Sequence, residues 1–209
     1  MSEGLLIAFE GLDGAGTTTQ AERTRDRLAE TRGERAYLTR EPTDGPVGAQ
    51  IRLGLAGRVD FDPKTMALLF AADRLDHLAQ DVVPKLDDGV TVLVDRYVLS
   101  SIAYQMAEPG VDGEWVAAIN REARDPDLTV FLDVPPEECL SRMEASRWRA
   151  ELYETEERLE RVYQNYTAAI EDLREHGQDV RVVDGTRPIP DVTEAVVSIV
   201  GDRLDAAAE

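Results

Sequence analysis

The chain has 209 residues, of which 43% are hydrophobic, enough for one domain with a buried core and no disulfide. The formal net charge is −19, from 42 acidic and 23 basic side chains spread along the sequence, so nonspecific nucleic-acid binding is disfavoured. No apolar run approaches the roughly 20 residues that span a bilayer, and the N-terminus resembles no targeting leader. We therefore expect a cytoplasmic protein with neither a nucleic-acid nor a membrane partner.

The basic residues are almost all arginines, because Lys64 and Lys85 are the only lysines. This much like charge repels itself at ordinary ionic strength and is screened in concentrated salt. The composition favours a salt-rich cytoplasm, as in a halophile, although an ordinary acidic protein has a similar profile. A lone cysteine, Cys139, is expected in the core, and His77 and His176 do not have metal-ligand spacing.

Short apolar runs rich in β-branched residues predict five buried strands, and segments with helical spacing lie between them. The longest helical segment runs from Met66 to Leu86 and follows Pro63. This alternation predicts an α/β fold with a parallel five-stranded sheet flanked by helices, in a single domain over residues 1–209. Ligands bind such sheets above the carboxyl ends of the strands. The predicted strands are Leu5–Phe9, Ala36–Thr39, Val90–Val94, Leu128–Leu132 and Val180–Val183.

A glycine-rich turn follows the first strand and precedes a segment compatible with a helix. It reads Gly11-Leu12-Asp13-Gly14-Ala15-Gly16-Thr17-Thr18. Its glycines let backbone amides face phosphate oxygens, and the start of the helix adds positive potential. Thr18 could place its hydroxyl on a magnesium ion, but Thr17 stands where most such loops have lysine. Strand, glycine spacing and helix together indicate phosphate binding rather than an ordinary turn.

Charged and polar side chains follow the strand that ends at Val94. Asp95 could hold magnesium through water and Arg96 could bind a phosphate bidentately, although an ion pair between the two is equally consistent. On a helix, residues spaced four apart after Arg96 would share one face, which by default is a solvated face. The polar residues in this stretch are Ser100, Ser101, Tyr104 and Gln105.

Phe70 and Arg74 lie four residues apart on the long predicted helix. A ring for stacking beside a guanidinium for a carbonyl oxygen suits a flat base. Taken alone, Phe70 is more typical of a core and Arg74 of a surface. Arg40 brings another cation to the edge of the sheet, where a surface turn set by Pro42 is the simpler interpretation.

Further arginines follow the fourth strand. Arg142 lies on the helix predicted after that strand, and Arg147 and Arg149 could belong to a lid over about 144–154 that closes on the triphosphate and stabilises charge on the transferring group. A helical salt-bridge network with Glu144, Glu151 and Glu154 is equally consistent. Arg187 follows the last strand in a turn against which an adenine could lie.

Taken in order, these segments resemble the motifs of the thymidylate kinase family, a group of P-loop nucleoside monophosphate kinases. The resemblance implies transfer of the γ-phosphate of ATP to dTMP, giving dTDP and ADP in dTTP synthesis, with Mg2+ as cofactor. It also implies a homodimer. The matching segments are Phe9–Gly16, Arg40–Pro42, Phe70 with Asp73–Arg74, Asp95–Tyr97, Ser100–Gln105 and Leu132–Val134.

The resemblance also implies roles for individual residues. Asp13 would bind the deoxyribose 3'-hydroxyl, Phe70 would stack on thymine, and Tyr104 would crowd a ribose 2'-position. Arg74 would reach a thymine carbonyl, and Arg40 with Arg96 would hold the dTMP phosphate. The expected sets are Asp13, Arg96, Arg147 and Arg149 for catalysis; Gly11, Leu12, Asp13, Gly14, Ala15, Gly16, Thr17, Thr18, Arg142 and Arg187 for ATP; Asp13, Arg40, Phe70, Arg74, Arg96, Ser100, Ser101, Tyr104 and Gln105 for dTMP; and Thr18 and Asp95 for the metal.

Two positions depart from the family pattern. Thr17 replaces the lysine of the phosphate loop, and Leu152 replaces an arginine in the lid motif formed with Glu151, Tyr153 and Glu154. Both changes remove positive charge from the place where phosphate would bind. Two alternatives therefore stay open: a kinase for another nucleotide or nucleoside, and a noncatalytic nucleotide-binding module.

The acidic composition predicts a salt dependence. The free energy of unfolding should rise between low salt and molar potassium chloride, because a Debye length of roughly 3 Å screens repulsion among the carboxylates. The check is the melting temperature across a potassium chloride series at constant pH. A melting temperature that is independent of salt, or decreases with it, would contradict the halophilic interpretation.

Overall fold

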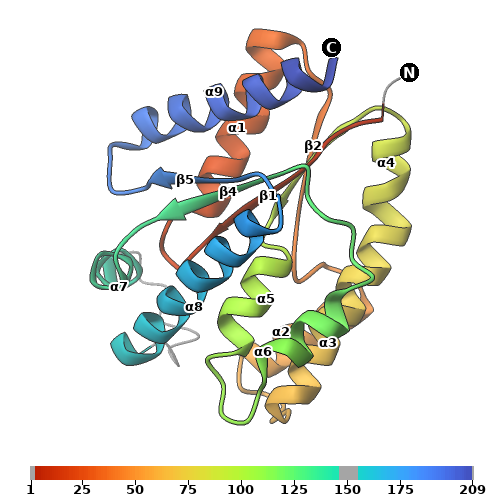
Figure 1. Cartoon of the computed structure of the whole chain (residues 1–209). Helices are drawn as coiled ribbons and strands as arrows, with labels where there is room; N and C mark the ends of the chain where they lie inside the picture. Colours follow the sequence, from red (N-terminus) through yellow and green to blue (C-terminus); the bar gives the residue numbers. More distant parts are fainter. Residues whose placement is uncertain (1–2, 146–154, 209) are drawn as a thin grey trace.

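The computed structural model describes residues 3–145 and 155–208 and is built on one parallel sheet (Figure 1). The strand order is β2-β3-β1-β4-β5, so the first strand lies at the centre. All the predicted strands and their parallel arrangement are confirmed, and each strand ends one or two residues later than the apolar runs indicate. The strands are β1 (Leu6–Gly11), β2 (Ala36–Arg40), β3 (Thr91–Asp95), β4 (Leu128–Asp133) and β5 (Val180–Asp184).

Helices cover both faces of this sheet (Figure 1). One face carries α1 (Thr17–Arg32) and α9 (Ile189–Ala208), which pack against each other, and the other carries α4 (Val83–Asp87), α5 (Val98–Gln105) and α8 (Glu156–Glu175). A further group packs beside α5: α2 (Pro46–Leu55), α3 (Pro63–His77) and α6 (Gly113–Asn120), while α7 (Pro136–Ala145) follows β4. No helix within the described ranges is long and apolar enough to cross a membrane.

The long predicted helix is continuous but not uniform. Between α3 and α4 lies a π-helical segment, η1 (Leu78–Val82), in which the N–H of Val83 donates to the carbonyl of Leu78, five residues earlier. Pro84 accounts for this widening, because proline has no N–H and its ring clashes with the carbonyl one turn before it. A single helical prediction over this stretch was therefore too simple.

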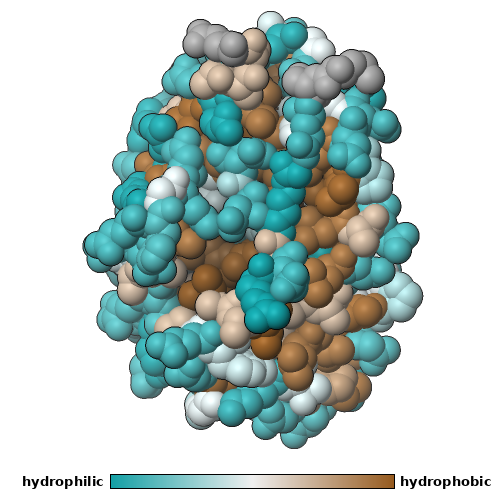
Figure 2. Space-filling model, turned by 45° about the vertical axis from the view of Figure 1, so that its right-hand side comes forward, coloured by the Kyte–Doolittle hydropathy of each residue, from teal (hydrophilic) through white to brown (hydrophobic). Residues whose placement is uncertain are grey.

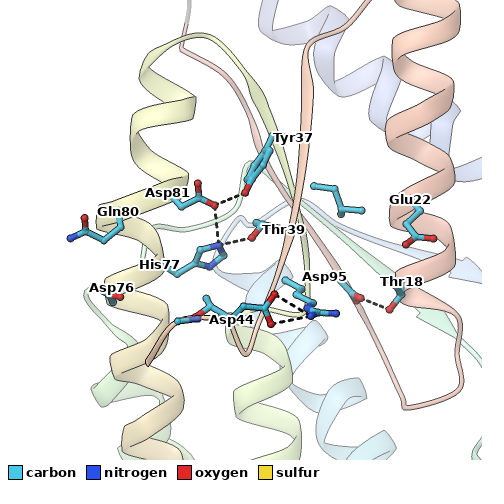
Figure 3. A pocket seen from close by; sticks show the side chains of 14 residues that line it. Thr18, Glu22, Tyr37, Thr39, Asp44, Asp76, His77, Gln80, Asp81 and Asp95 are labelled. Carbon is cyan, nitrogen blue, oxygen red and sulfur yellow. Dashed lines mark hydrogen bonds and ion pairs between the residues drawn. The ribbon is translucent and has the colours of Figure 1, made fainter. Parts of the chain in front are cut away.

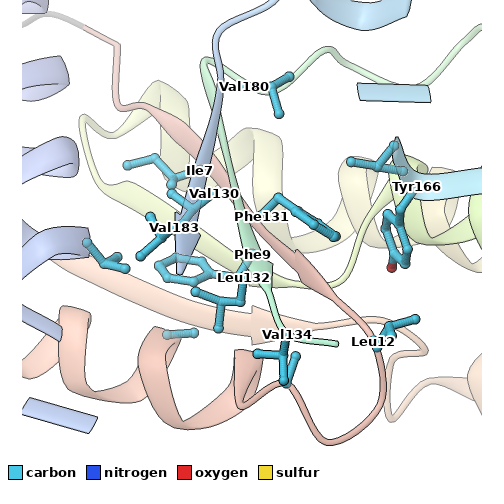
Figure 4. Packing of buried hydrophobic residues seen from close by; sticks show 14 of the residues in the cluster. Ile7, Phe9, Leu12, Val130, Phe131, Leu132, Val134, Tyr166, Val180 and Val183 are labelled. Carbon is cyan, nitrogen blue, oxygen red and sulfur yellow. The ribbon is translucent and has the colours of Figure 1, made fainter. Parts of the chain in front are cut away.

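The core lies on both sides of β1, which is buried along its whole length. Leu6 and Ala8 face the cluster beneath α4, whereas Ile7 and Phe9 face the larger cluster shown in Figure 4. Tyr166 of α8 belongs to that larger cluster, with its ring 5.0 Å from the ring of Phe131. The central strand is thus held from both sides, and the loop that follows it starts from a rigid base.

The expectation for Cys139 is confirmed. The side chain has no exposed surface and belongs to the main core cluster. Burial raises the pKa of its thiol to about 12, so the thiolate that a reactive cysteine needs is disfavoured.

Candidate active site

The phosphate loop leaves β1 at Gly11 and enters α1 at Thr17. Gly14 and Gly16 have φ values of +88° and +95°, a region that residues with a Cβ rarely adopt. A Cβ on Gly14 would also lie 2.7 Å from the carbonyl oxygen of Cys139. Both the backbone conformation and the lack of space for a Cβ require glycine at position 14, in agreement with the glycine-rich turn predicted from the sequence.

The loop presents its backbone, not its apolar side chains, to a ligand. Leu12 and Ala15 are buried in the core, and the N–H of Ala15 donates to the carbonyl of Leu12 at 3.0 Å, which closes the turn. The N-terminal end of α1 points into the loop, where its unpaired N–H groups and dipole favour an anion. Thr17 is 6% exposed and has no ammonium group to offer.

Thr18 and Asp95, the two predicted metal residues, lie in contact. The Thr18 hydroxyl donates to Oδ2 of Asp95, whose side chain is buried at the end of β3. Its other oxygen, Oδ1, has no hydrogen-bond partner among the residues that the structure describes. An unpaired buried carboxylate oxygen is costly, and hydroxyl and carboxylate oxygens are ligands that suit Mg2+.

The same two residues could not enclose a metal by themselves. Across residues 3–145 and 155–208, no group of three or more His, Cys, Asp or Glu side chains is arranged to hold one. Mg2+ commonly takes one or two protein ligands and completes its shell with phosphate oxygens and water. The arrangement therefore fits a metal that arrives with a nucleotide.

Arg96 adopts an unusual backbone conformation. Its φ is +70°, and it is the one non-glycine residue with positive φ in the described part of the chain. Such strain costs about 1–3 kcal/mol and persists where surrounding contacts hold it. The guanidinium donates to the carbonyl of Gly11 at 3.0 Å and to Oγ of Ser100 at 3.3 Å, and it forms an ion pair with Asp13.

The shared face expected after Arg96 is confirmed for Ser100 and Tyr104, but the default interpretation of a solvated face was wrong, because Ser101 and Gln105 are buried and neither Ser100 nor Tyr104 is fully exposed. Ser100 and Tyr104 lie one turn apart on α5, whereas Arg96 precedes the helix and folds back so that its guanidinium lies 5.2 Å from the centre of the Tyr104 ring. The Tyr104 hydroxyl accepts a hydrogen bond from the N–H of Asp13 at 2.9 Å. Arg96 pairs with Asp13, so the alternative of an ion pair with Asp95 is not what the described residues form.

Arg74 is buried, with 1% of its surface exposed, although the sequence alone favoured a surface position. It donates from Nε to Glu41 at 2.9 Å, from Nη2 to Oγ of Ser101 at 3.0 Å, and from Nη1 to Oδ1 of Asn120. The ring of Tyr97 lies 5.1 Å from its guanidinium carbon. These partners compensate for the loss of water that makes an unpaired buried cation costly.

The remaining base-pocket candidates flank Arg74. Phe70 is half-buried and lies one turn before Arg74 on α3, so part of its ring can still stack on a base. Gln105 is 6% exposed at the end of α5, and its Oε1 has no hydrogen-bond partner among the described residues. An acceptor of this kind in a buried position can bind a donor on a base.

A cavity of about 500 Å³ opens between α1, β2 and α3 (Figure 3). Thr18 and Asp95 line one side, and His77 and Asp81 line the other. Arg40, the last residue of β2, reaches it with a largely exposed side chain that pairs with Asp44 at 3.1 Å. The lining does not include Phe70, Arg74 or Tyr104. The cavity therefore connects Thr18 and Asp95 with Arg40 and does not reach the base-pocket candidates.

The outer arginines are only partly described. Arg142 on α7 donates to Glu138 at 3.0 Å, a glutamate outside the salt-bridge network considered as an alternative, and to the carbonyl of Gly185 at 3.1 Å, in the turn after β5. Arg187 is exposed in that turn. Arg147, Arg149 and most of the proposed lid lie outside the described residues.

Sequence reasoning missed several buried polar residues. Glu41 and His77 form a pair at 3.1 Å behind Arg74, and Asn120 of α6 holds Arg74 from the other side. Glu10 has no exposed surface, and burial raises the pKa of its carboxyl. A glutamate inside an apolar strand was a visible signal for Glu10, whereas nothing in the sequence near Asn120 indicates its partner.

Comparisons with known proteins agree with this site. A sequence profile described as thymidylate kinase matches residues 9–196. A probable thymidylate kinase of Pyrobaculum calidifontis is 40% identical over 196 residues, covering 94% of this chain and 95% of the relative. A putative thymidylate kinase of Aeropyrum pernix is 44% identical over 183 residues, covering 87% and 86%, and a probable thymidylate kinase of Thermococcus gammatolerans is 37% identical over 209 residues, covering 96% and 98%. The chain belongs to the thymidylate kinase family.

Proposed function

We propose that this chain is an active dTMP kinase that transfers the γ-phosphate of ATP to dTMP and releases dTDP and ADP. The carrying observation is the position of Arg96. Its strained backbone holds a guanidinium between the carbonyl of Gly11 and the carboxylate of Asp13, directly beside the phosphate loop. An acceptor phosphate bound there would lie next to the donor phosphates, and phosphoryl transfer requires little from the protein beyond such positioning and charge neutralisation.

ATP would bind with its phosphates on the amides of the loop and the N-terminal end of α1. Thr18 and Asp95 would hold Mg2+, which neutralises charge on the phosphates when bound. Arg142 reaches the turn after β5, where Arg187 is exposed, and these two residues would line the nucleoside end of ATP.

dTMP would lie between α3 and α5. Phe70 would stack on thymine, while Arg74, Ser101 and Gln105 would provide its polar contacts. Contacts within the described residues engage four of the five N–H groups of the guanidinium of Arg74, since Nη2 also lies 2.7 Å from Glu41, so one N–H on Nη1 remains for a base carbonyl. Asp13 would bind the 3'-hydroxyl of the sugar and Tyr104 would crowd its 2'-position. The phosphate would be held by Arg40 and Arg96.

This function predicts selectivity that a nucleotide panel can measure. With ATP and Mg2+ in molar potassium chloride, dTMP should be phosphorylated faster than dUMP, dCMP, dGMP, AMP or UMP, because Tyr104 leaves little room for a 2'-hydroxyl and the base pocket suits thymine. The diphosphate products are separated by chromatography, which does not depend on a coupling enzyme. Equal turnover of dTMP and UMP would contradict the assignment. Binding of ATP and dTMP without any dTDP at any salt concentration would favour the noncatalytic alternative.

The absence of lysine at position 17 calls for another source of positive charge. We propose that Arg147 and Arg149 supply it from the lid, together with Mg2+ and the loop amides. Arginines that reach the transferring phosphate in related reactions contribute about 10³–10⁵ in rate. A bidentate guanidinium is able to replace the point charge of an ammonium group.

Changing Arg147 and Arg149 together to alanine should therefore abolish turnover while dTMP affinity stays near that of the unchanged protein. Thr17→Lys should restore part of the activity of this double variant, because it returns a cation to the loop. The measurements are the turnover number and the dTMP dissociation constant for each protein, with Arg25→Ala as a control, because Arg25 is a partly exposed arginine of α1 that pairs with Asp26 and has no proposed role at the site. A double variant with unchanged turnover would show that the lid arginines are not the source.

We also propose that the chain works as a homodimer of single-domain subunits in the cytoplasm. Exposed apolar residues recur at helical spacing along α3 and into η1, at Leu68, Ala72, Leu75 and Ala79. Leu68 is 50% and Leu75 40% exposed, which is unusual on so charged a chain. Figure 2 shows apolar side chains gathered among polar ones on one face of the molecule. A second copy of the same helix would cover this stripe.

Leu75→Glu should convert the dimer to a monomer, because it places a charge at the centre of the covered stripe. Light scattering after size exclusion in molar salt measures the change, from twice the 23.1 kDa chain mass to that mass. Ile189→Glu is the matched control, since Ile189 is 54% exposed at the start of α9, away from this stripe. A dimer that survives Leu75→Glu would place the interface elsewhere.

A further inference from the structure

Glu10 is a buried carboxylate that the reaction as described does not use. It lies in β1 with no exposed surface. Its Oε1 accepts hydrogen bonds from the backbone N–H of Tyr97 at 2.9 Å and of Ser100 at 3.2 Å. Its Oε2 accepts from the Ser100 hydroxyl and shares the single hydrogen of the Tyr166 hydroxyl, 3.3 Å away, with the carbonyl of Gly11. One side chain thus joins the central strand to the start of α5 and to α8.

These contacts surround the strained residue Arg96. The N–H of Arg96 donates to the carbonyl of Phe9 at 2.9 Å, and the next N–H, that of Tyr97, donates to Glu10. Two consecutive backbone donors are therefore held by two consecutive residues of β1. Because a left-handed conformation at a residue with a Cβ persists only where its surroundings hold it, these bonds account for the φ of +70°.

The same network reaches the guanidinium of Arg96. Ser100 donates to Glu10 and accepts from Nη1 of Arg96, and the carbonyl of Gly11 accepts both from Arg96 at 3.0 Å and from the Tyr166 hydroxyl at 3.1 Å. Backbone and side chain of Arg96 are thus fixed through one buried group. A carboxylate near the N-terminal end of α5 is also favoured by the helix dipole.

We propose that Glu10 is a positioning residue that holds Arg96 in the geometry needed to bind the phosphate of dTMP. Glu10 touches neither substrate and acts through the turn at Arg96 and through Ser100. The inference rests on the proposed function, in which Arg96 binds that phosphate. Both Glu10 oxygens accept hydrogen bonds in this network, so the positioning role depends on hydrogen-bond acceptance at a buried site.

If Glu10 has this role, it affects binding of the dTMP phosphate and not binding of the base and sugar. Calorimetric titrations with dTMP and with thymidine distinguish these two contributions. Glu10→Ala should weaken dTMP binding by about tenfold or more, because two buried backbone N–H groups lose their acceptor and the turn is released. Thymidine, which has no phosphate, should keep its affinity within about twofold. Glu10→Gln should restore dTMP binding to within about threefold of the unchanged protein, since its amide oxygen can accept the same two N–H groups.

Equal weakening of dTMP and thymidine in Glu10→Ala, or no weakening of either, would overturn the proposal. If Glu10→Ala does not fold, Tyr166→Phe gives the same test, because it removes the hydroxyl bound to Glu10 and Gly11 and keeps the ring in the core. It should weaken dTMP binding severalfold and leave thymidine unchanged, whereas loss of both or neither would contradict the role. Tyr163→Phe is the matched control on α8, since its hydroxyl bonds Asp133 at 2.9 Å. Unchanged protein that binds dTMP no tighter than thymidine would instead refute the proposed function.

Discussion

The site depends on the central position of β1 in the parallel sheet. Pairing places Phe9 opposite Asp95 of β3, and Gly11 opposite Leu132 of β4. The phosphate loop therefore rises directly beside the end of β3, where Asp95 and Arg96 follow. A one-residue shift of this register would turn every side chain of β1, including Glu10, toward the opposite face of the sheet, where its packing partners are absent. The fold therefore sets the distance between the loop, the end of β3 and Arg96.

Buried carboxylates near the carboxyl ends of the strands orient the arginines of the candidate site. Glu10 holds the turn at Arg96, and Glu41 holds Arg74, whose guanidinium is 2.7 Å from the Glu41 carboxylate. Both arginines are thereby oriented by the protein before a substrate binds. Ordering two long side chains in advance removes an entropy cost that binding would otherwise bear.

The sequence predicted local features well and long-range polar contacts poorly. The strands and the glycine loop follow from patterns that mark strand ends and phosphate loops, and the same patterns select Thr18 and Asp95, which the structure brings into contact. The burial of Arg74 did not follow, because its partners Glu41 and Asn120 are 33 and 46 residues away and come from a loop and another helix. Pro84 was a sign in the sequence that the long helix is disturbed. The proline alone did not show that the helix continues as α4 against the sheet, which leaves a π-helical turn rather than a break.

The carboxylates that line the cavity make phosphate binding without a lysine at position 17 more demanding. Glu22, Asp44, Asp76, Asp81 and Asp95 all line it, while Arg40 is the one arginine that does so among the described residues. This charge opposes the approach of a nucleotide triphosphate when Mg2+ is absent. A divalent ion held by Thr18 and Asp95 would offset this negative charge toward the phosphates, and high salt screens the more exposed acids. Phosphate affinity in this protein should therefore rely on the metal and on backbone amides more than in an enzyme that keeps the loop lysine.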